Sequence, residues 1–135
     1  DLASEGVEVD LDTLEYIHLH KTGALLQASV LSGALIAGAD DTLLEALRTY
    51  SRAIGLAFQI IDDILDVTAS SEVLGKTAGK DLTADKTTYP KLLGLEESKA
   101  RAEALVQEAC GVLKPWSEKA QPLLALAGYI TSRDR

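Results

Sequence analysis

The sequence predicts an all-α fold in a single domain, and three observations support this prediction. Leu and Ala dominate the 135 residues, whereas β-branched residues are sparse. Apolar residues recur at helical spacing, and no segment alternates apolar and polar residues for long, as a half-buried strand would. A chain of this length buries one core rather than two independent ones. We therefore expect one helical bundle over residues 1–135.

The composition excludes several classes of protein. The 13 basic and 21 acidic residues give a net charge of −8, which argues against binding to nucleic acid through bulk positive charge. A single cysteine, Cys110, permits no intramolecular disulfide and favours a reducing compartment. The longest apolar stretch, Leu25–Ala39, is interrupted by Gln27, so we expect a buried helix there and no membrane span.

The first helix is expected from about Asp12 to about Ala37. Asp12 has the side chain of an N-cap, and Glu15 follows three residues later, as in a capping box. Gly38 is a typical residue for the position just beyond a helix end.

A long central helix is expected next, from Thr42 to about Val67. Asp40 and Asp41 precede it where an N-cap belongs. The pattern then changes to Ser, Thr, Gly, Lys and Asp over Thr68–Pro90, which predicts a long functional loop. Two further helices are expected, near Leu95–Val112 and Glu118–Ser132, with Lys114 and Pro115 between them.

The central helix carries an acidic stripe on an apolar surround. At about 100° per residue, its polar side chains fall within an arc of roughly 100°, and they are Gln59, Asp62, Asp63 and Asp66. A helix that is apolar on most sides is buried, so we expect the three carboxylates to face an internal cleft, where a cation must neutralise them. Oxygen ligands without His or Cys favour Mg²⁺ shared with a substrate phosphate. A solvated acidic face is the alternative interpretation.

Lys21 lies in the middle of an apolar face of the first helix, shared with Leu14, Ile17, Leu25 and Ala28. Either it binds an anion in the same cleft, or it extends its ammonium group into solvent along its aliphatic stem. Thr22 offers a hydroxyl hydrogen bond to the same anion.

The predicted loop contains Lys76, Lys80 and Lys86 among glycines. It does not match a nucleotide P-loop, because the glycine that the motif requires is replaced by Ser70 and a helix precedes it instead of a strand. We interpret it as a lysine-bearing lid that closes over a polyphosphate, although a solvated surface loop has the same composition.

The remaining candidates are weaker. His18 and His20 are two residues apart on a helix and point in different directions, so we expect surface or core histidines and no metal pair. Cys110 lies in a plain helical context, and no Gly-x-Ser-x-Gly motif is present, so nothing supports nucleophilic catalysis.

Together these segments resemble the C-terminal half of the trans-isoprenyl diphosphate synthases, most closely those of the plant geranylgeranyl diphosphate synthase type. The resemblance spans almost the whole chain, and several motifs recur in the family's order. They are Ile17-His-Leu-His-Lys-Thr22, Phe58-Gln-Ile-Ile-Asp-Asp-Ile-Leu-Asp66, Leu74-Gly-Lys-Thr-Ala-Gly-Lys-Asp81, Asp85-Lys86 and Thr88-Tyr89-Pro90. The resemblance implies an isoprenoid synthase-type helical bundle around a central cleft, with this chain as the C-terminal part of one prenyltransferase domain.

The resemblance also implies a reaction. Members of the family join isopentenyl diphosphate to an allylic diphosphate by Mg²⁺-dependent ionisation, condensation and elimination, and the product is a linear prenyl diphosphate, here geranylgeranyl diphosphate. By matching position, Asp62 is expected to ligate Mg²⁺, with Asp63 and Asp66 contributing directly or through water. The residues expected to bind substrate are Lys21, Thr22, Gln59, Lys76 and Lys86, of which Lys21 and Lys76 act in catalysis together with Asp62.

One departure from the family pattern is clear. Only the second of the two aspartate-rich motifs is present, and no methionine occurs at position 1. We therefore expect a C-terminal fragment that is inactive by itself and works with the N-terminal part of the same enzyme. The resemblance further implies a homodimer, or a heterodimer with a small subunit, and a location in the plastid.

Three alternatives stay open. The catalytic large subunit of a heteromeric geranyl diphosphate synthase looks almost the same over this region. A non-catalytic regulatory subunit of the same fold is expected to lose the aspartates and lysines that this chain keeps. A terpene cyclase also uses Asp-rich helices and Mg²⁺, but the Lys-Thr pair and the Gly-Lys loop are more typical of chain elongation.

Overall fold

The computed structural model describes residues 9–74 and 87–132, with side chains described outside 70–74, and every regular element in these ranges is helical. In order, the helices are α1 Leu11–His18, the π-helical segment η2 Leu19–Gly23, α2 Ala24–Ile36, α3 Asp41–Leu74, α4 Tyr89–Leu93, α5 Leu95–Val112, the 3₁₀ turn η3 Lys114–Trp116 and α6 Gln121–Ser132. The all-α prediction is confirmed.

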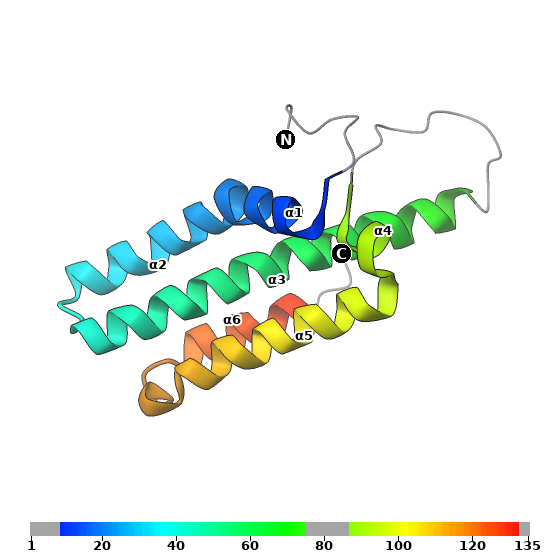
Figure 1. Cartoon of the computed structure of the whole chain (residues 1–135). Helices are drawn as coiled ribbons and strands as arrows, with labels where there is room; N and C mark the ends of the chain where they lie inside the picture. The colour runs from blue at the N-terminus through cyan, green and yellow to red at the C-terminus, as the bar shows by residue number, and fades with distance from the viewer. Residues whose placement is uncertain (1–8, 75–86, 133–135) are drawn as a thin grey trace.

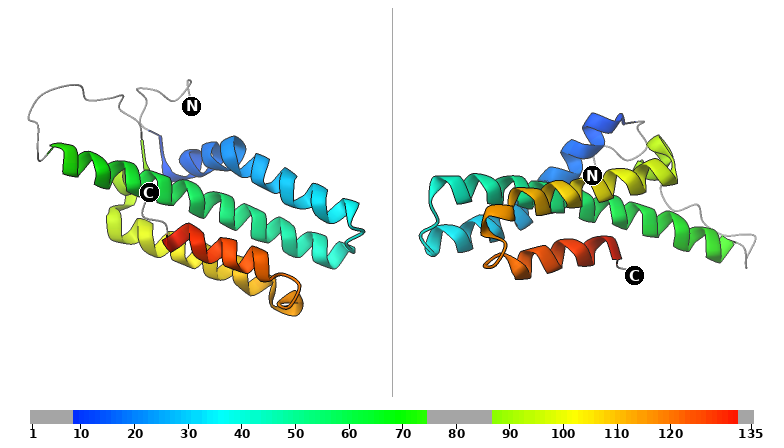
Figure 2. Two further views of the ribbon diagram at one scale, coloured as in Figure 1. Left: turned by 180° about the vertical axis from the view of Figure 1, so that it is seen from behind. Right: turned by 90° about the horizontal axis from the view of Figure 1, so that it is seen from below.

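The long helix α3 runs through the middle of the molecule (Figures 1 and 2). On one side it packs against α1, η2 and α2, and on the other against α5 and α6. The chain reverses direction between α2 and α3 and again between α3 and α5, so these neighbours are antiparallel. The side chains of the acidic stripe therefore belong to a helix that packs against other helices on two sides.

The first helix starts earlier than its sequence suggests. The N-cap is Asp10 rather than Asp12, because the Asp10 carboxylate accepts a hydrogen bond of 2.9 Å from the backbone N–H of Thr13. The Thr13 hydrogen bond also lowers the pKa of the Asp10 carboxyl group. The predicted capping box is wrong, since Asp12 lies in the first turn and Glu15 bonds elsewhere.

The predicted apolar face that contained Lys21 does not form, because a π-helical segment interrupts it. The i→i+5 pattern of Leu19–Gly23 inserts one extra residue in the helical register. Leu14 is consequently buried at 3% exposure, whereas Leu25 is 70% exposed. A periodicity of 3.6 residues cannot anticipate this change, because no Pro or Gly pair marks where it starts.

The central helix is confirmed and is longer than predicted. The Asp40 carboxylate caps it by accepting 2.8 Å from the N–H of Leu43, and α3 continues to Leu74. Thr68 does not start a loop, because its hydroxyl donates back to the carbonyl of Ile64 at 3.0 Å and is satisfied within the helix. Residues 75–86, including the predicted lid, lie outside the described part of the chain.

The later helices follow the prediction with one shift. Helix α5 has the predicted bounds, and Gly38 and Gly94 adopt φ values of 75° and 84° at helix ends. Helix α6 starts at Gln121 rather than Glu118, because the 3₁₀ turn at Pro115 is followed by a backbone hydrogen bond from Ala120 to Trp116.

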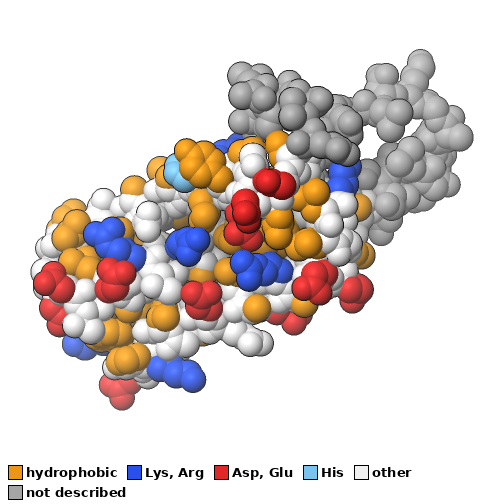
Figure 3. Space-filling model, in the orientation of Figure 1, with side chains coloured by type: hydrophobic (Ala, Val, Ile, Leu, Met, Phe, Trp, Pro, Cys, Tyr) orange, Lys and Arg blue, Asp and Glu red, His pale blue; other side chains and the backbone are white. Residues whose placement is uncertain are grey.

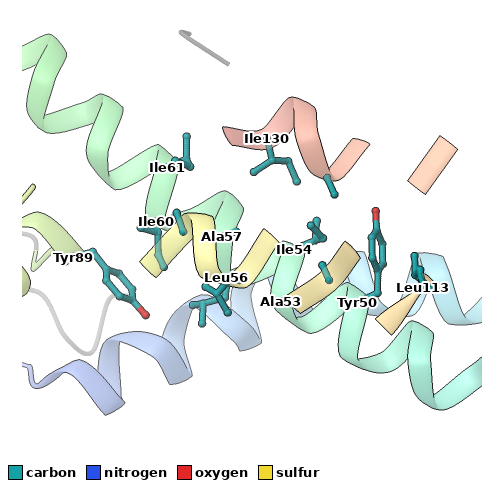
Figure 4. Packing of buried hydrophobic residues seen from close by; sticks show 14 of the residues in the cluster. Tyr50, Ala53, Ile54, Leu56, Ala57, Ile60, Ile61, Tyr89, Leu113 and Ile130 are labelled. Atoms are coloured by element: carbon teal, nitrogen blue, oxygen red, sulfur yellow. The ribbon is translucent and has the colours of Figure 1, made fainter. Parts of the chain in front are cut away.

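The core lies along α3, where the neighbouring helices meet it (Figure 4). Its fully buried large side chains include Tyr50, Ile60, Tyr89 and Leu113. The hydroxyl of Tyr50 donates 2.8 Å to the carbonyl of Leu123, which satisfies the one polar atom of that side chain and ties α3 to α6.

Helix α2 has no charged residue, and the expectation of a buried helix at Leu25–Ala39 is wrong, because none of these residues is buried. Leu35 and Ile36 near its end are 61% and 89% exposed. Among the described helices, none combines the length and apolar character required to cross a membrane. An exposed face of this kind is typical of a surface that another segment covers.

Candidate functional site

The acidic stripe of α3 divides into two environments. Asp62 is half-buried and Asp66, one turn further, is exposed. The amide nitrogen of Gln59 donates to an oxygen of Asp62 at 3.5 Å, so these side chains lie next to each other on one face. Residues four apart share a helix face, which brings Asp66 to the same side as Asp62.

Asp63 lies in the other environment, since it is buried inside the bundle and does not share the accessible face of Asp62 and Asp66. The residue is 2% exposed. Its Oδ2 atom lies 3.1 Å from Nε2 of His18 and accepts a hydrogen bond of 3.1 Å from the backbone N–H of Tyr89. A carboxylate held by its own partners inside the bundle lacks the freedom of a solvated metal ligand, and loss of either partner would leave a buried polar group unpaired.

Within residues 9–74 and 87–132, no group of three His, Cys, Asp or Glu side chains is placed to hold a metal ion. A Mg²⁺ ion that shares its coordination with phosphate and water needs only one or two protein carboxylates. Asp62 and Asp66 fit this requirement, because they are hard oxygen donors on one accessible helix face.

Lys21 and Thr22 lie in the π-helical segment η2, which packs against α3. Lys21 is exposed and Thr22 is half-buried. The contact is close, because a Cβ atom added to Gly55 would lie 2.9 Å from Cα of Gly23. Because Gly55 has no side chain, the two backbones can approach this closely.

A polar chain extends from the buried carboxylate to the surface. The hydroxyl of Tyr89 donates to Oε1 of Glu15 at 2.6 Å, and Arg101 lies 3.3 Å from the same oxygen. Burial, followed by the hydrogen bond to Glu15, raises the pKa of Tyr89. The Tyr89 ring also stacks on His18, with centroids 5.8 Å apart.

A groove of about 340 Å³ lies between the helices, and its lining includes Glu15 and Arg101 of this polar chain. It is lined by charged side chains of both signs from α1, α3 and α5, among them Arg48, Arg52, Glu45 and Glu108. Figure 3 shows basic and acidic side chains interspersed over this middle part of the molecule. Neither Lys21 nor Asp62 lines this groove, so it is distinct from the acidic stripe.

The sequence analysis missed the partners of Asp63. His18 was expected to be a surface or core histidine, and it is a core histidine that is 3% exposed. His20 instead stacks on Tyr16 and bonds to its carbonyl, so the two histidines do point in different directions. A signal was available, since His18 falls on the buried face with Leu14, four residues earlier. Lys76 and Lys86 lie outside the described residues.

The sequence of this chain matches one protein family and several proteins of known name. A family model described as "Polyprenyl synthetase" matches residues 1–124. The chain is 57% identical over 136 residues to "Geranylgeranyl pyrophosphate synthase, chloroplastic" of Catharanthus roseus, covering 99% of this chain and 38% of the relative. It is also 57% identical to "Heterodimeric geranylgeranyl pyrophosphate synthase large subunit 1, chloroplastic" of Arabidopsis thaliana, covering 98% and 37%. The chain thus spans less than two-fifths of these relatives.

Solved structures agree with the fold. A putative farnesyl-diphosphate synthase from Marinomonas sp. superposes with a TM-score of 0.82 at 43% identity, covering 97% of this chain and 43% of the other. A geranyltransferase from Helicobacter pylori, complexed with magnesium and isoprenyl diphosphate, gives a TM-score of 0.70 at 31% identity, covering 98% and 43%.

Proposed function

This chain belongs to the polyprenyl synthetase family, and we propose that the whole protein condenses isopentenyl diphosphate with an allylic diphosphate to give a linear prenyl diphosphate. The observation that carries the proposal is the shared, accessible helix face of Asp62 and Asp66 on α3, the helix against which the segment with Lys21 and Thr22 packs. Geranylgeranyl diphosphate is the proposed product, since relatives at 57% identity are named for it.

Magnesium ions are the proposed cofactor, and Asp62 and Asp66 are the residues that would hold them. Both are carboxylates accessible from one side, and the Helicobacter pylori relative at 31% identity was crystallised with magnesium and isoprenyl diphosphate. Bound magnesium supplies electrostatic stabilisation of the departing diphosphate. Asp63 is left out of this ligand set because its side chain is buried inside the bundle, where its Oδ2 atom bonds to His18 and Tyr89.

The remaining residues of the site bind the diphosphate and keep it in place. Lys21 supplies positive charge where the leaving group gains negative charge, and such electrostatic stabilisation is the largest contribution in this kind of chemistry. Thr22 offers a hydroxyl donor, and Gln59 orients the Asp62 carboxylate through its amide. Lys76 and Lys86 are proposed to bind the same diphosphate from the segment between α3 and α4.

The whole protein is also proposed to work as an assembly. The uncharged, exposed helix α2 needs a covering segment, and the relatives are more than twice as long as this chain. We propose that the N-terminal part of the same enzyme provides it, and that the 135-residue chain alone is inactive. A homodimer or a heterodimer with a small subunit is proposed in addition, because one relative is a heterodimeric large subunit.

The plastid is the proposed location, because the names of the relatives from Catharanthus roseus and Arabidopsis thaliana include "chloroplastic". A fluorescent fusion of the whole protein in its native cells tests this, and fluorescence outside plastids would contradict it.

The decisive experiment joins this chain to the N-terminal part of a relative. In a chimera, this chain replaces the region of the Catharanthus roseus relative that it matches. We expect magnesium-dependent formation of a linear prenyl diphosphate by the chimera and none by the isolated chain. A cyclic hydrocarbon would favour a terpene cyclase, and turnover by the isolated chain would contradict the need for the N-terminal part.

A further inference from the structure

Three separate segments meet at the buried carboxylate of Asp63. The Oδ2 atom contacts Nε2 of His18, the last residue of α1, and the backbone N–H of Tyr89, the first residue of α4. Both contacts are 3.1 Å, and they bridge 45 and 26 residues of sequence. Asp63 therefore links α1 and the start of α4 to α3, although these segments are far apart in the sequence. We call this set of contacts the junction.

The partners of this junction are as buried as the carboxylate. His18 is 3% exposed, and its ring stacks on that of Tyr89 with an interplanar angle of 11°. Its Nδ1 atom has no hydrogen-bond partner in the part of the chain that the structure describes, so Nε2 makes the only side-chain hydrogen bond of the ring there. Removal of either partner leaves a buried polar group unpaired, which is strongly unfavourable.

A second fixed point lies further along the same pair of antiparallel segments. The Gly23 and Gly55 backbones approach so closely that a Cβ atom on Gly55 would be 2.9 Å from Cα of Gly23. His18 pairs with Asp63 at one end, and Gly23 meets Gly55 at the other. The residues between these two points include Lys21 and Thr22 on one side and Gln59 and Asp62 on the other.

We propose that His18 and Asp63 are positioning residues, which hold the segment with Lys21 and Thr22 in register against the turn of α3 that carries Asp62. This inference rests on the proposed function. The aspartate-rich stretch then has two separate tasks, in which Asp62 and Asp66 bind and Asp63 anchors. The same junction fixes Tyr89, the first residue of α4.

The test compares Asp63→Asn with the matched variant Asp62→Asn in the whole protein. An Asn at position 63 keeps an oxygen that accepts from Tyr89, so the fold is retained. We expect Asp63→Asn to lower the melting temperature while the magnesium concentration for half-maximal binding of inorganic pyrophosphate changes by less than about threefold. We expect Asp62→Asn to raise that concentration at least tenfold with an unchanged melting temperature. Equal increases in both variants would overturn the proposal.

His18 is tested by removal and by partial rescue. For His18→Ala, assayed below its melting temperature, we expect a drop in kcat of at least tenfold with KM for isopentenyl diphosphate within threefold. His18→Gln, which retains an N–H donor, is expected to recover part of the loss in kcat. Unchanged kcat in a folded His18→Ala variant would overturn the positioning role.

Failure of the proposed function would give a different result from failure of the positioning role. In that case the unmodified whole protein would neither bind pyrophosphate with magnesium nor form product. A double-mutant cycle of His18→Ala and Asp63→Asn on the melting temperature would still report the junction, so the contact and the function are judged separately. Additive effects in that cycle would overturn the junction itself.

Discussion

Gly55 of α3 and Gly23 of the π-helical segment meet backbone to backbone, and a Cβ atom built on Gly55 would lie 2.9 Å from Cα of Gly23. The atom it would meet is main chain, which cannot move aside as a flexible side chain can. This contact sets how closely the segment with Lys21 and Thr22 approaches α3. The spacing of the proposed site thus depends on the absence of a side chain at Gly55.

Gly55→Ala is expected to destabilise the fold. The added methyl group overpacks the helix crossing, which costs about 1–3 kcal/mol in the free energy of unfolding. Urea denaturation followed by circular dichroism measures this cost as a lower midpoint. The control is Gly33→Ala in the exposed part of α2, where nothing lies within 4 Å of the new Cβ atom. That variant is expected to gain about 0.5–1 kcal/mol from helix propensity. A Gly55→Ala midpoint at or above that of the unmodified protein would contradict the close contact.

The two candidate N-caps of α1 can be separated by mutation. Asp10→Ala is expected to lower the urea midpoint, because it removes the acceptor for the backbone N–H of Thr13. Asp12→Ala is expected to have the smaller effect, since Asp12 only lies in the first turn near the helix dipole. The hydrogen bond lowers the pKa of Asp10, so the difference between Asp10→Ala and the unmodified protein should shrink as pH falls below about 4. A larger decrease in the urea midpoint for Asp12→Ala than for Asp10→Ala would support Asp12 as the N-cap instead.

Tyr50 makes stability depend on alkaline pH. Burial, with a smaller contribution from Cys110, raises its pKa to about 12, compared with about 10 in an unfolded chain. The phenol therefore stays protonated to a higher pH in the folded state than in the unfolded one. Its contribution to stability is complete below about pH 10 and is lost as pH rises from about 10 to about 12.

We expect Tyr50→Phe to be less stable than the unmodified protein at pH 8, because the hydrogen bond to the carbonyl of Leu123 is lost. That deficit should shrink steadily between about pH 10 and 12 in thermal unfolding experiments. Tyr129→Phe serves as the control, because Tyr129 is 61% exposed. A deficit that is constant with pH would show that Tyr50 ionises alike in both states.

Lys21→Ala in the whole protein is expected to lower kcat by about 10²-fold or more, because the charge that stabilises the leaving diphosphate is removed. Lys21→Arg should retain a larger share of the activity. Lys99 offers a matched control, since it is an exposed lysine of α5 paired with Glu96 at 3.1 Å. Steady-state kinetics with isopentenyl diphosphate and an allylic diphosphate measure the difference. Equal decreases in kcat for Lys21→Ala and Lys99→Ala would contradict a role for Lys21 in binding the diphosphate.

The helices themselves were predictable from local features. Asp40 before an apolar periodic run predicted the start of α3, and the carboxylate does accept from Leu43. The bounds of Leu95–Val112 were correct, because a glycine precedes the run and a proline follows it closely. The end of α3 was not predicted. Thr68 reads as a loop residue by composition, but its hydroxyl bonds back to Ile64 within the helix.

The sequence predicts that the aspartates of the acidic stripe share one side of a helix, but it does not predict their separate environments. Periodicity put Asp62, Asp63 and Asp66 on one side of a helix and could not distinguish between them. The structure separates Asp63, because α1 and the start of α4 happen to pack over its position and supply His18 and the Tyr89 amide. Residues 45 and 26 positions away have no local signal in the sequence around Asp63.

The helical class and a buried central helix follow from the sequence alone, since propensity, periodicity and charge act over a few neighbouring residues. The sequence also predicts an oxygen-rich site flanked by lysines, and this site stays a prediction. The tertiary structure decided which carboxylate became an anchor and how the π-helical turn presents Lys21. Those outcomes depend on contacts between segments far apart in the chain. Burial and backbone approach at such contacts exist only after the helices have packed.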